Sequence, residues 1–259
     1  MKSISRFIFA VTFFVFLFGC AAQQNKKQQS VIQISTIDAL LQGVYDGQTT
    51  LENLRELGDF GIGTFNGLDG EMIFVDGEFY QVKSDGKIYK PAADVKTPFA
   101  SVTRFEEEQV VQLGNNSYES FKLLTDSLMK TVNLFFAIKL KGEFSYIKTR
   151  SVPAQTKPYP SLLEVTKNQP EFEATNISGQ LVGFYCPKFV KGINVPEYHL
   201  HFLSDDKKFG GHLLEFRLKK GSVTLDKIER FEMILPNEGD FLKSEFETDR
   251  SGELKKVES

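Results

Sequence analysis

The chain of 259 residues has few cysteines, little net charge and no hydrophobic run of membrane-spanning length. Only Cys20 and Cys186 are present, so if Cys20 carries lipid, no disulfide can form within the chain and the core alone must stabilise the fold. The net charge is −3, without the basic field that would favour nucleic acid as a partner. The apolar run at residues 7–18 is too short for a spanning helix.

The N-terminal residues have the order of an export signal. Lys2 and Arg6 precede the apolar run, and Cys20 follows it. This order predicts a lipoprotein-type signal peptide over residues 1–19, with Cys20 as the lipidated residue, and a polar tether over residues 20–34. We therefore expect an exported protein, either a membrane-anchored lipoprotein or a periplasmic or extracellular one. Ordinary secretory cleavage and an uncleaved anchor stay open as alternatives.

The remaining chain has the composition of a globular protein, with 41% hydrophobic and 25% charged residues. Asp-Gly turns separate short apolar runs over residues 60–89, which predicts a β-meander. The expected fold class is mixed α/β (α+β) and β-rich, with two sub-structures that are each built around a β-sheet with a few helices. The proline-bearing segment 151–160 predicts their boundary, with an N-terminal α/β sub-structure at 35–150 and a C-terminal β-rich one at 151–259.

Apolar spacing also predicts individual elements. Short helices are expected at residues 35–43, 50–58, 117–130 and 162–169. Further strands are expected at residues 99–105, 107–113, 134–140, 143–149 and 177–184.

The three histidines of the chain, His199, His201 and His212, all lie between positions 199 and 212. Residues two apart point to the same face of a β-strand, and the flanking residues alternate between apolar and polar as a strand requires. The charged and glycine-rich stretch at 204–211 predicts a turn. A second strand from His212 to about Leu218 would then bring the third imidazole back beside the first two.

Three converging imidazoles without an obvious fourth protein ligand are typical of an open metal site, as in catalytic zinc centres. Imidazole also binds copper, iron and nickel, so the spacing does not identify the metal. A single strand histidine is usually a surface or satisfied core residue, but the clustering favours the metal site. Asp205 and Asp206 are expected to form a solvated turn rather than add ligands. Cys186 is expected to be a small buried residue rather than a nucleophile.

Long motifs in this chain resemble those of bacterial alpha-acetolactate decarboxylases. The resemblance extends from about residue 35 to the C-terminus. The motifs that carry it are GVYDGQTTLENLRELGDF, GIGTFNGLDGEMIFVDGEFY, TPFA, Arg150 with the nearby VPAQTKPYPSL, and YHLHFLSDDKKFGGHLLEF.

The resemblance implies a homodimeric zinc enzyme, a carboxy-lyase that converts 2-acetolactate, a 2-hydroxy-3-keto acid, to acetoin and carbon dioxide. The family's zinc ligands correspond to His199, His201 and His212. The other site residues that the resemblance implies are Glu71, Arg150 and Glu258 as catalytic groups, with Thr64 and Arg150 binding substrate. Glu253 is the alternative to Glu258. Without the resemblance, these residues would read as ordinary loop, strand or tail positions.

The implied chemistry suits these residue types. Loss of carbon dioxide leaves an electron pair that the neighbouring ketone can take up as an enediolate, which zinc would stabilise. Arg150 can hold a carboxylate or an oxyanion with its planar set of donors. Glu71 or Glu258 could supply the proton that the enediolate then needs, and the sequence does not choose between them.

Two other functions stay open at this point. A cupin-like metal oxygenase also carries H-x-H on a strand, but cupins usually have a glutamate a few residues later, where this chain has Asp205. A non-catalytic zinc-binding exported lipoprotein would need neither Glu71 nor Arg150. Metal analysis, oxygen consumption and acetoin formation separate these functions.

Overall fold

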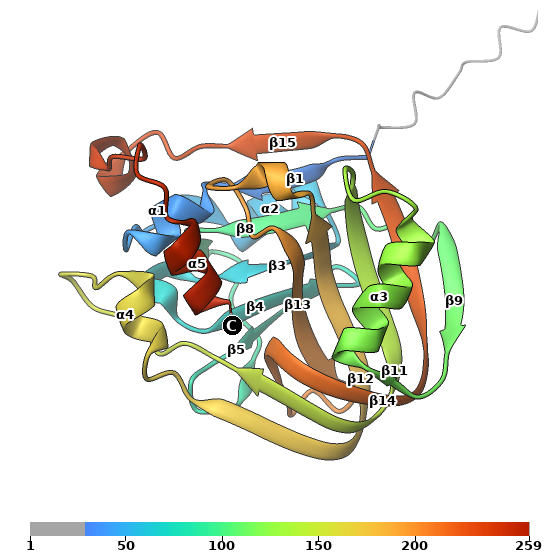
Figure 1. Ribbon diagram of the computed structural model, residues 1–259. Coiled ribbons are helices and arrows are strands. Elements are labelled where there is room, and N and C mark those ends of the chain that lie inside the picture. The colour runs from blue at the N-terminus through green and yellow to red at the C-terminus, as the bar shows by residue number, and fades with distance from the viewer. Residues whose placement is uncertain (1–28, 259) are drawn as a thin grey trace, which may run out of the picture.

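A computed structural model describes residues 29–258 of the chain, which form two packed β-sheets with short helices around them (Figure 1). The first sheet has seven strands and is antiparallel except for the parallel pair of β15 and β1 at one edge. Its strands, in spatial order, are β15 (Phe231–Ile234), β1 (Val31–Ile34), β8 (Ala100–Thr103), β3 (Phe60–Thr64), β4 (Glu71–Val75), β5 (Glu78–Val82) and β6 (Ile88–Tyr89).

The second sheet is antiparallel and includes the longest strands of the described chain. Its strands are β10 (Asn116–Ser117), β14 (Gly210–Ile228), β11 (Phe135–Arg150), β12 (Glu171–Cys186), β13 (Glu197–Ser204) and β9 (Gln109–Leu113). Because β13 pairs with both β12 and the start of β14, the four strands β11, β12, β13 and β14 close into a ring. A further small sheet pairs β2 (Thr49–Thr50) with β7 (Lys96–Thr97).

Alternation along β11 shows how the second sheet is buried on both faces. Phe135 and Ala137 belong to the core between the two sheets, whereas Phe136 and Ile138 belong to the core on the other face. Successive residues of a strand point to opposite faces, so one apolar run serves both cores. The helix α3 (Tyr118–Met129) covers the outer core with Phe121 and begins at a capping box formed by Ser117 and Ser120.

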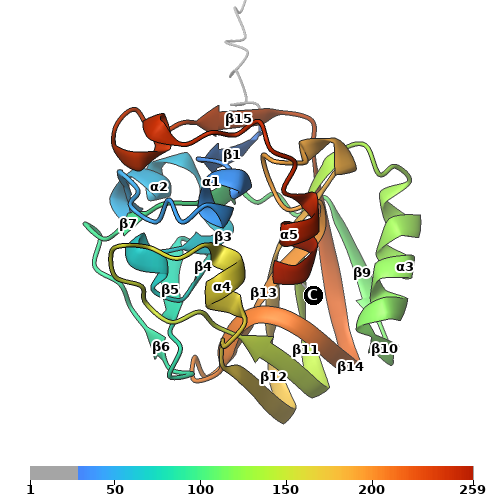
Figure 2. The ribbon, with the colours of Figure 1, turned by 60° about the vertical axis from the view of Figure 1, so that its left-hand side comes forward.

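The remaining helices gather on the other side of the molecule. In Figures 1 and 2, α1 (Ile37–Leu41), α4 (Leu162–Thr166) and α5 (Ser251–Val257) lie side by side, and they share one apolar cluster. The helix α2 (Leu51–Leu57) packs on the first sheet. Three short 3-10 turns complete the described elements, at η1 (Asn66–Leu68), η2 (Lys188–Val190) and η3 (Gly239–Lys243).

The predicted β-rich α+β fold is confirmed, and the four predicted helices are all present, each shorter than predicted. Two predicted strands at 134–140 and 143–149 are one continuous strand, β11, and β12 begins before the predicted residue 177. The sheets also divide the chain differently from the predicted boundary after residue 150. Both β11 before that point and β12 after it lie in the second sheet, and β15 returns to the first.

The predicted signal peptide at 1–19 and Cys20 lie outside the described residues. The predicted tether at 20–34 is only partly described, and its last four residues are wrong as a tether because Val31–Ile34 form β1 inside the first sheet. Val31 is fully buried there and packs in the core between the sheets. Among residues 29–258, no helix is long and apolar enough to cross a membrane.

Candidate active site

The predicted histidine hairpin is confirmed, and it brings the three imidazoles together. His201 on β13 pairs directly with His212 on β14, and His199 lies two residues earlier on β13. The ring centroids are 5.1 to 5.4 Å apart. One potential ligand atom from each ring lies within 4.8 Å of those of the other two. The three side chains therefore share one face of the hairpin and could hold one metal ion.

Burial keeps these imidazoles neutral. It lowers the pKa of His199 to about 3, and the positive charge of Arg150 lowers it further. Burial also lowers the pKa values of His201 and His212 well below their usual range. A neutral imidazole has a free lone pair on one ring nitrogen, which is the form that ligates a metal.

His201 supplies the observation that tests whether a metal fits. Its Nδ1 lies 2.8 Å from the carbonyl oxygen of Met72, so Nδ1 carries the proton and donates it to that carbonyl. The other nitrogen, Nε2, is then an acceptor, and it is buried without a hydrogen-bond partner in the described part of the chain. An unpartnered buried lone pair that faces two further imidazoles fits a cation, and the backbone bond on Nδ1 is the usual outer-shell support of a metal-binding histidine.

Strand register also places Arg150 at the site. Arg150 is the last residue of β11 and pairs with His212 on β14. Its side chain is almost completely buried, and its Nη2 lies 3.2 Å from His212 Nε2, which accepts a hydrogen bond from it. Arg150, His212 and His201 thus stand on three neighbouring strands of the ring. A buried guanidinium beside an open pocket is suited to bind an anionic substrate group.

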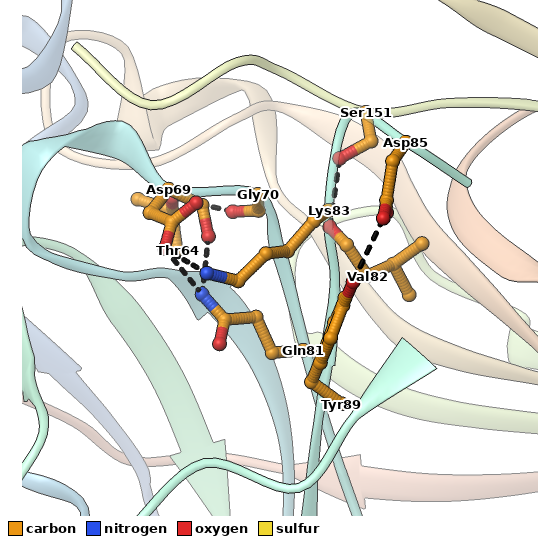
Figure 3. A network of polar contacts seen from close by, with 9 residues as sticks. All are labelled: Thr64, Asp69, Gly70, Gln81, Val82, Lys83, Asp85, Tyr89 and Ser151. Atoms are coloured by element: carbon orange, nitrogen blue, oxygen red, sulfur yellow. Dashed lines mark hydrogen bonds and ion pairs between the residues drawn. The ribbon is translucent and has the colours of Figure 1, made fainter. Parts of the chain in front are cut away.

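Glu71 comes from the first sheet, at the start of β4, and a network of polar contacts fixes the turn before it (Figure 3). The hydroxyl of Thr64 donates to the carbonyl oxygen of Gly70 at 2.7 Å. Lys83 forms an ion pair of 2.6 Å with Asp69. Gly70 has a φ of +86° and lies so close to the next strand that a Cβ there would meet the carbonyl oxygen of Val82 at 2.2 Å. The Asp-Gly turn therefore requires glycine at this position.

The carboxyl group of Glu71 faces the histidines. Its Oε2 lies 3.5 Å from His201 Nε2, and the backbone N–H of Val152 donates to the carboxylate. Burial raises the pKa of Glu71 to about 8, against the opposing effect of Arg150, and the charge of Glu258 adds to the rise. A carboxyl group of this pKa can hold a proton at neutral pH, which a proton donor requires.

The C-terminal helix α5 places a second carboxyl group, that of Glu258, beside the histidines. Leu254 and Val257 bury the helix against α1 and α4, and Glu258 follows directly. Its Oε2 lies 3.6 Å from His212 Nε2, and burial raises its pKa. The alternative, Glu253, forms an ion pair of 3.0 Å with Arg250 and does not line the pocket. The structure therefore places Glu258, and not Glu253, at the site.

These groups line one pocket between the two sheets and the helices α1, α4 and α5. It holds about 480 Å³ of space outside the protein atoms, part of it open to solvent. Thr64 lines the pocket, although its hydroxyl hydrogen is committed to Gly70. Sequence reasoning did not assign the residues that complete the wall to the site, because most of them are apolar and cannot be told from core positions in the sequence. They are chiefly Ile37, Leu40, Phe99, Leu162, Thr166 and Gln169.

Cys186 and Asp206 lie outside the candidate active site, as the sequence analysis predicted. Cys186 is fully buried among apolar side chains, and burial raises the pKa of its thiol to about 12, so it is not a nucleophile. Asp206 lies in the turn of the hairpin and accepts hydrogen bonds from the hydroxyl of Ser204 and the backbone of Lys208.

A β-rich fold with three imidazoles, two carboxyl groups and a guanidinium in one pocket defines a small-molecule enzyme with a metal-binding ligand set. The sequence pattern of the alpha-acetolactate decarboxylase family matches residues 31–248. The chain belongs to this family.

Individual relatives agree with that assignment. An alpha-acetolactate decarboxylase of Methanosarcina mazei is 46% identical over 235 residues, which are 90% of this chain and 82% of the relative. The crystal structure of alpha-acetolactate decarboxylase from Bacillus subtilis strain 168 superposes with a TM-score of 0.87 at 37% identity, covering 89% of this chain and 99% of that one. A Staphylococcus aureus structure, described as a protein of unknown function similar to alpha-acetolactate decarboxylase, superposes with a TM-score of 0.84 at 31% identity, covering 88% of this chain and 98% of that one. The family match ends before α5, so the placement of Glu258 rests on the geometry of this chain.

Proposed function

We propose that this protein decarboxylates 2-acetolactate to acetoin and carbon dioxide with Zn²⁺ as its metal. The observation that carries the proposal is the convergence of three neutral imidazoles, Glu71, Arg150 and Glu258 in one pocket of a chain that belongs to this family. A protein that only binds zinc would gain nothing from a buried arginine and two buried carboxyl groups beside the ligands, because each is costly to bury.

His199, His201 and His212 would hold the metal. When bound, Zn²⁺ acts as a Lewis acid that polarises the substrate's ketone and stabilises negative charge on its oxygen atoms. The choice of zinc follows from the family resemblance, and the all-imidazole ligand set with an open position is compatible with it because that arrangement is typical of catalytic zinc.

Arg150 binds and orients the substrate in this proposal. Its backbone is fixed by pairing with His212 and its side chain is almost completely buried, so its donors keep a fixed direction toward the pocket. It can bind the substrate carboxylate before the reaction. As carbon dioxide leaves, the C–C bond breaks and its electron pair moves into the neighbouring ketone to give an enediolate. The guanidinium of Arg150 can also stabilise the negative charge on the enediolate oxygen atoms.

Either Glu71 or Glu258 supplies the proton that converts the enediolate to acetoin. The enediolate carbon must gain one proton to become acetoin, and a carboxyl group supplies a proton only if it is protonated at the working pH. Burial raises the pKa values of both carboxyl groups, and each lies beside a different imidazole, Glu71 beside His201 and Glu258 beside His212. One of them delivers the proton to carbon, and solvent later restores it.

The direct test is to incubate the purified protein with Zn²⁺ and racemic 2-acetolactate and to measure acetoin and carbon dioxide. We expect equal amounts of the two products and no oxygen consumption. Zinc binding without acetoin would refute the proposed reaction, and oxygen consumption would favour an oxygenase.

We also propose that the protein is exported and that Cys20 carries a lipid. The support is the order of Lys2, Arg6, the apolar run at 7–18 and Cys20 in the sequence. When the wild-type protein is expressed in a bacterium, it should be found in the membrane fraction with a lipid on Cys20. The Cys20→Ser protein should carry no lipid and should be either exported in soluble form or left with its signal peptide uncleaved. Mass spectrometry of an unmodified Cys20 in the membrane-associated protein would contradict lipidation.

We propose, thirdly, that the protein is a homodimer, as the family resemblance implies. β15 is the outermost strand of the first sheet and leaves Met233, Ile234 and Leu235 more than one-third exposed. An open strand edge with apolar side chains can pair with the same edge of a second copy. Sedimentation velocity should show a dimer for the wild-type protein and a monomer for Ile234→Lys. A wild-type monomer at micromolar concentration would refute the dimer.

A further inference from the structure

Gln169 is a polar residue in the wall of the active-site pocket without a role in the mechanism above. It lies three residues after α4 and lines the same pocket as Glu71, Arg150 and the histidines. Its side-chain oxygen, Oε1, is buried and has no hydrogen-bond partner among residues 29–258. A buried carbonyl group that lacks a partner costs free energy, so its presence in a pocket wall indicates that a ligand supplies the missing donor.

The backbone around Gln169 holds this side chain in place. Its N–H donates to the carbonyl oxygen of Thr166 at the end of α4. The next residue is Pro170, whose carbonyl oxygen accepts from the N–H of Ser151 at 3.3 Å. Proline also restricts the conformation of the residue before it. Gln169 is therefore fixed by the helix on one side and by the chain that follows Arg150 on the other.

The pairing of β11 with β12 brings the segment that contains Gln169 beside the chain that follows Arg150. Arg150 pairs with Glu171, and the N–H of Ser151 donates to the carbonyl oxygen of Pro170, so the chain before β12 continues beside the chain that follows Arg150. The N–H of Val152 donates to the carboxylate of Glu71. Gln169 and Val152 both line the pocket that also contains Arg150 and Glu71.

The chemistry of the pocket narrows what Gln169 can bind. Arg150 provides only donors, whereas an amide oxygen provides an acceptor. A 2-hydroxy-3-keto acid has one strong donor, its hydroxyl group, beside the carboxylate that Arg150 would bind. We propose that Gln169 is a further substrate-binding residue, whose Oε1 accepts the hydrogen bond of the substrate's 2-hydroxyl group; this inference rests on the proposed function.

The test compares two small acids that differ only in this group. 2-Hydroxy-2-methylpropanoate has the hydroxyl, and 2,2-dimethylpropanoate has a methyl group in its place. Binding of each to the Zn²⁺-loaded full-length protein is measured by calorimetry, which requires no turnover. Gln169→Met keeps the length of the side chain and removes the amide. The exposed neighbour provides the matched control, Asn168→Met.

We expect Gln169→Met to reduce the preference for the hydroxy acid roughly tenfold, to raise the KM for 2-acetolactate by a similar factor, and to leave the zinc content unchanged. Asn168→Met should behave as the wild-type protein. An unchanged preference in Gln169→Met would refute the proposal, and so would an equal loss of affinity for both acids. If Gln169→Met does not fold, the same comparison is made with Gln169→Ala. A wild-type protein that binds both acids but forms no acetoin would refute the proposed reaction and still leave the preference to decide the role of Gln169.

Discussion

Glu71→Gln is expected to keep the metal and to lower the rate of acetoin formation roughly 10²- to 10⁴-fold, the usual contribution of a positioned acid or base. Glutamine has almost the same volume as glutamic acid and can still accept from the N–H of Val152, so the turn and the pocket should be preserved. An amide cannot deliver a proton to carbon. The measurements are kcat for 2-acetolactate and zinc content by atomic emission.

Two further variants make this prediction specific. Glu78→Gln changes an exposed glutamate of the adjacent strand β5 and should leave kcat unchanged. Glu258→Gln tests the second carboxyl group of the pocket. The variant with the larger loss of kcat identifies the carboxyl group that delivers the proton. Activity of Glu71→Gln close to that of the wild-type protein would remove Glu71 from the mechanism.

His201→Ala is expected to lose both metal and activity. His201 is fully buried and provides the unpartnered Nε2 that faces the other two imidazoles. Loss of even an outer-shell partner typically weakens metal binding by roughly 10- to 100-fold, and loss of a ligand should exceed that. Zinc affinity by competition with a chelator and acetoin formation at saturating substrate are the two measurements.

The control for this variant lies in the turn of the same hairpin. Asp205→Ala changes an exposed acidic residue and should keep both zinc and activity, which separates the role of the ligand from a general disturbance of the hairpin. Circular dichroism shows whether His201→Ala remains folded. An active His201→Ala protein that binds no metal would contradict the proposed site.

The histidine hairpin could be predicted because all of its signals are local. The two-residue spacing of His199 and His201 and the Gly-rich turn before His212 are enough to define two paired strands. The placement of Glu71 and Arg150 came from motif resemblance, and the structure explains it through strand register. Neither residue carries a local signal, because each approaches the histidines from another strand.

Longer-range features were beyond this reasoning. Gly142 made β11 look like two strands, but it pairs with Gly179 on β12 and Gly221 on β14, where three backbones approach closely without side chains. Glu258 lies in what appeared to be a charged tail. Its position depends on Leu254 and Val257, whose burial against α1 and α4 appears only after the helices have packed together.

In the proposed function, acetoin formation requires a metal ion held by the three histidines. The decisive measurement is a titration of the chelator-stripped protein with Zn²⁺, with the rate of acetoin formation recorded at each addition. We expect negligible acetoin formation without metal and a rate that rises until about one Zn²⁺ per chain is bound. Full activity in the stripped protein, or a rate that does not respond to any added metal, would contradict this requirement.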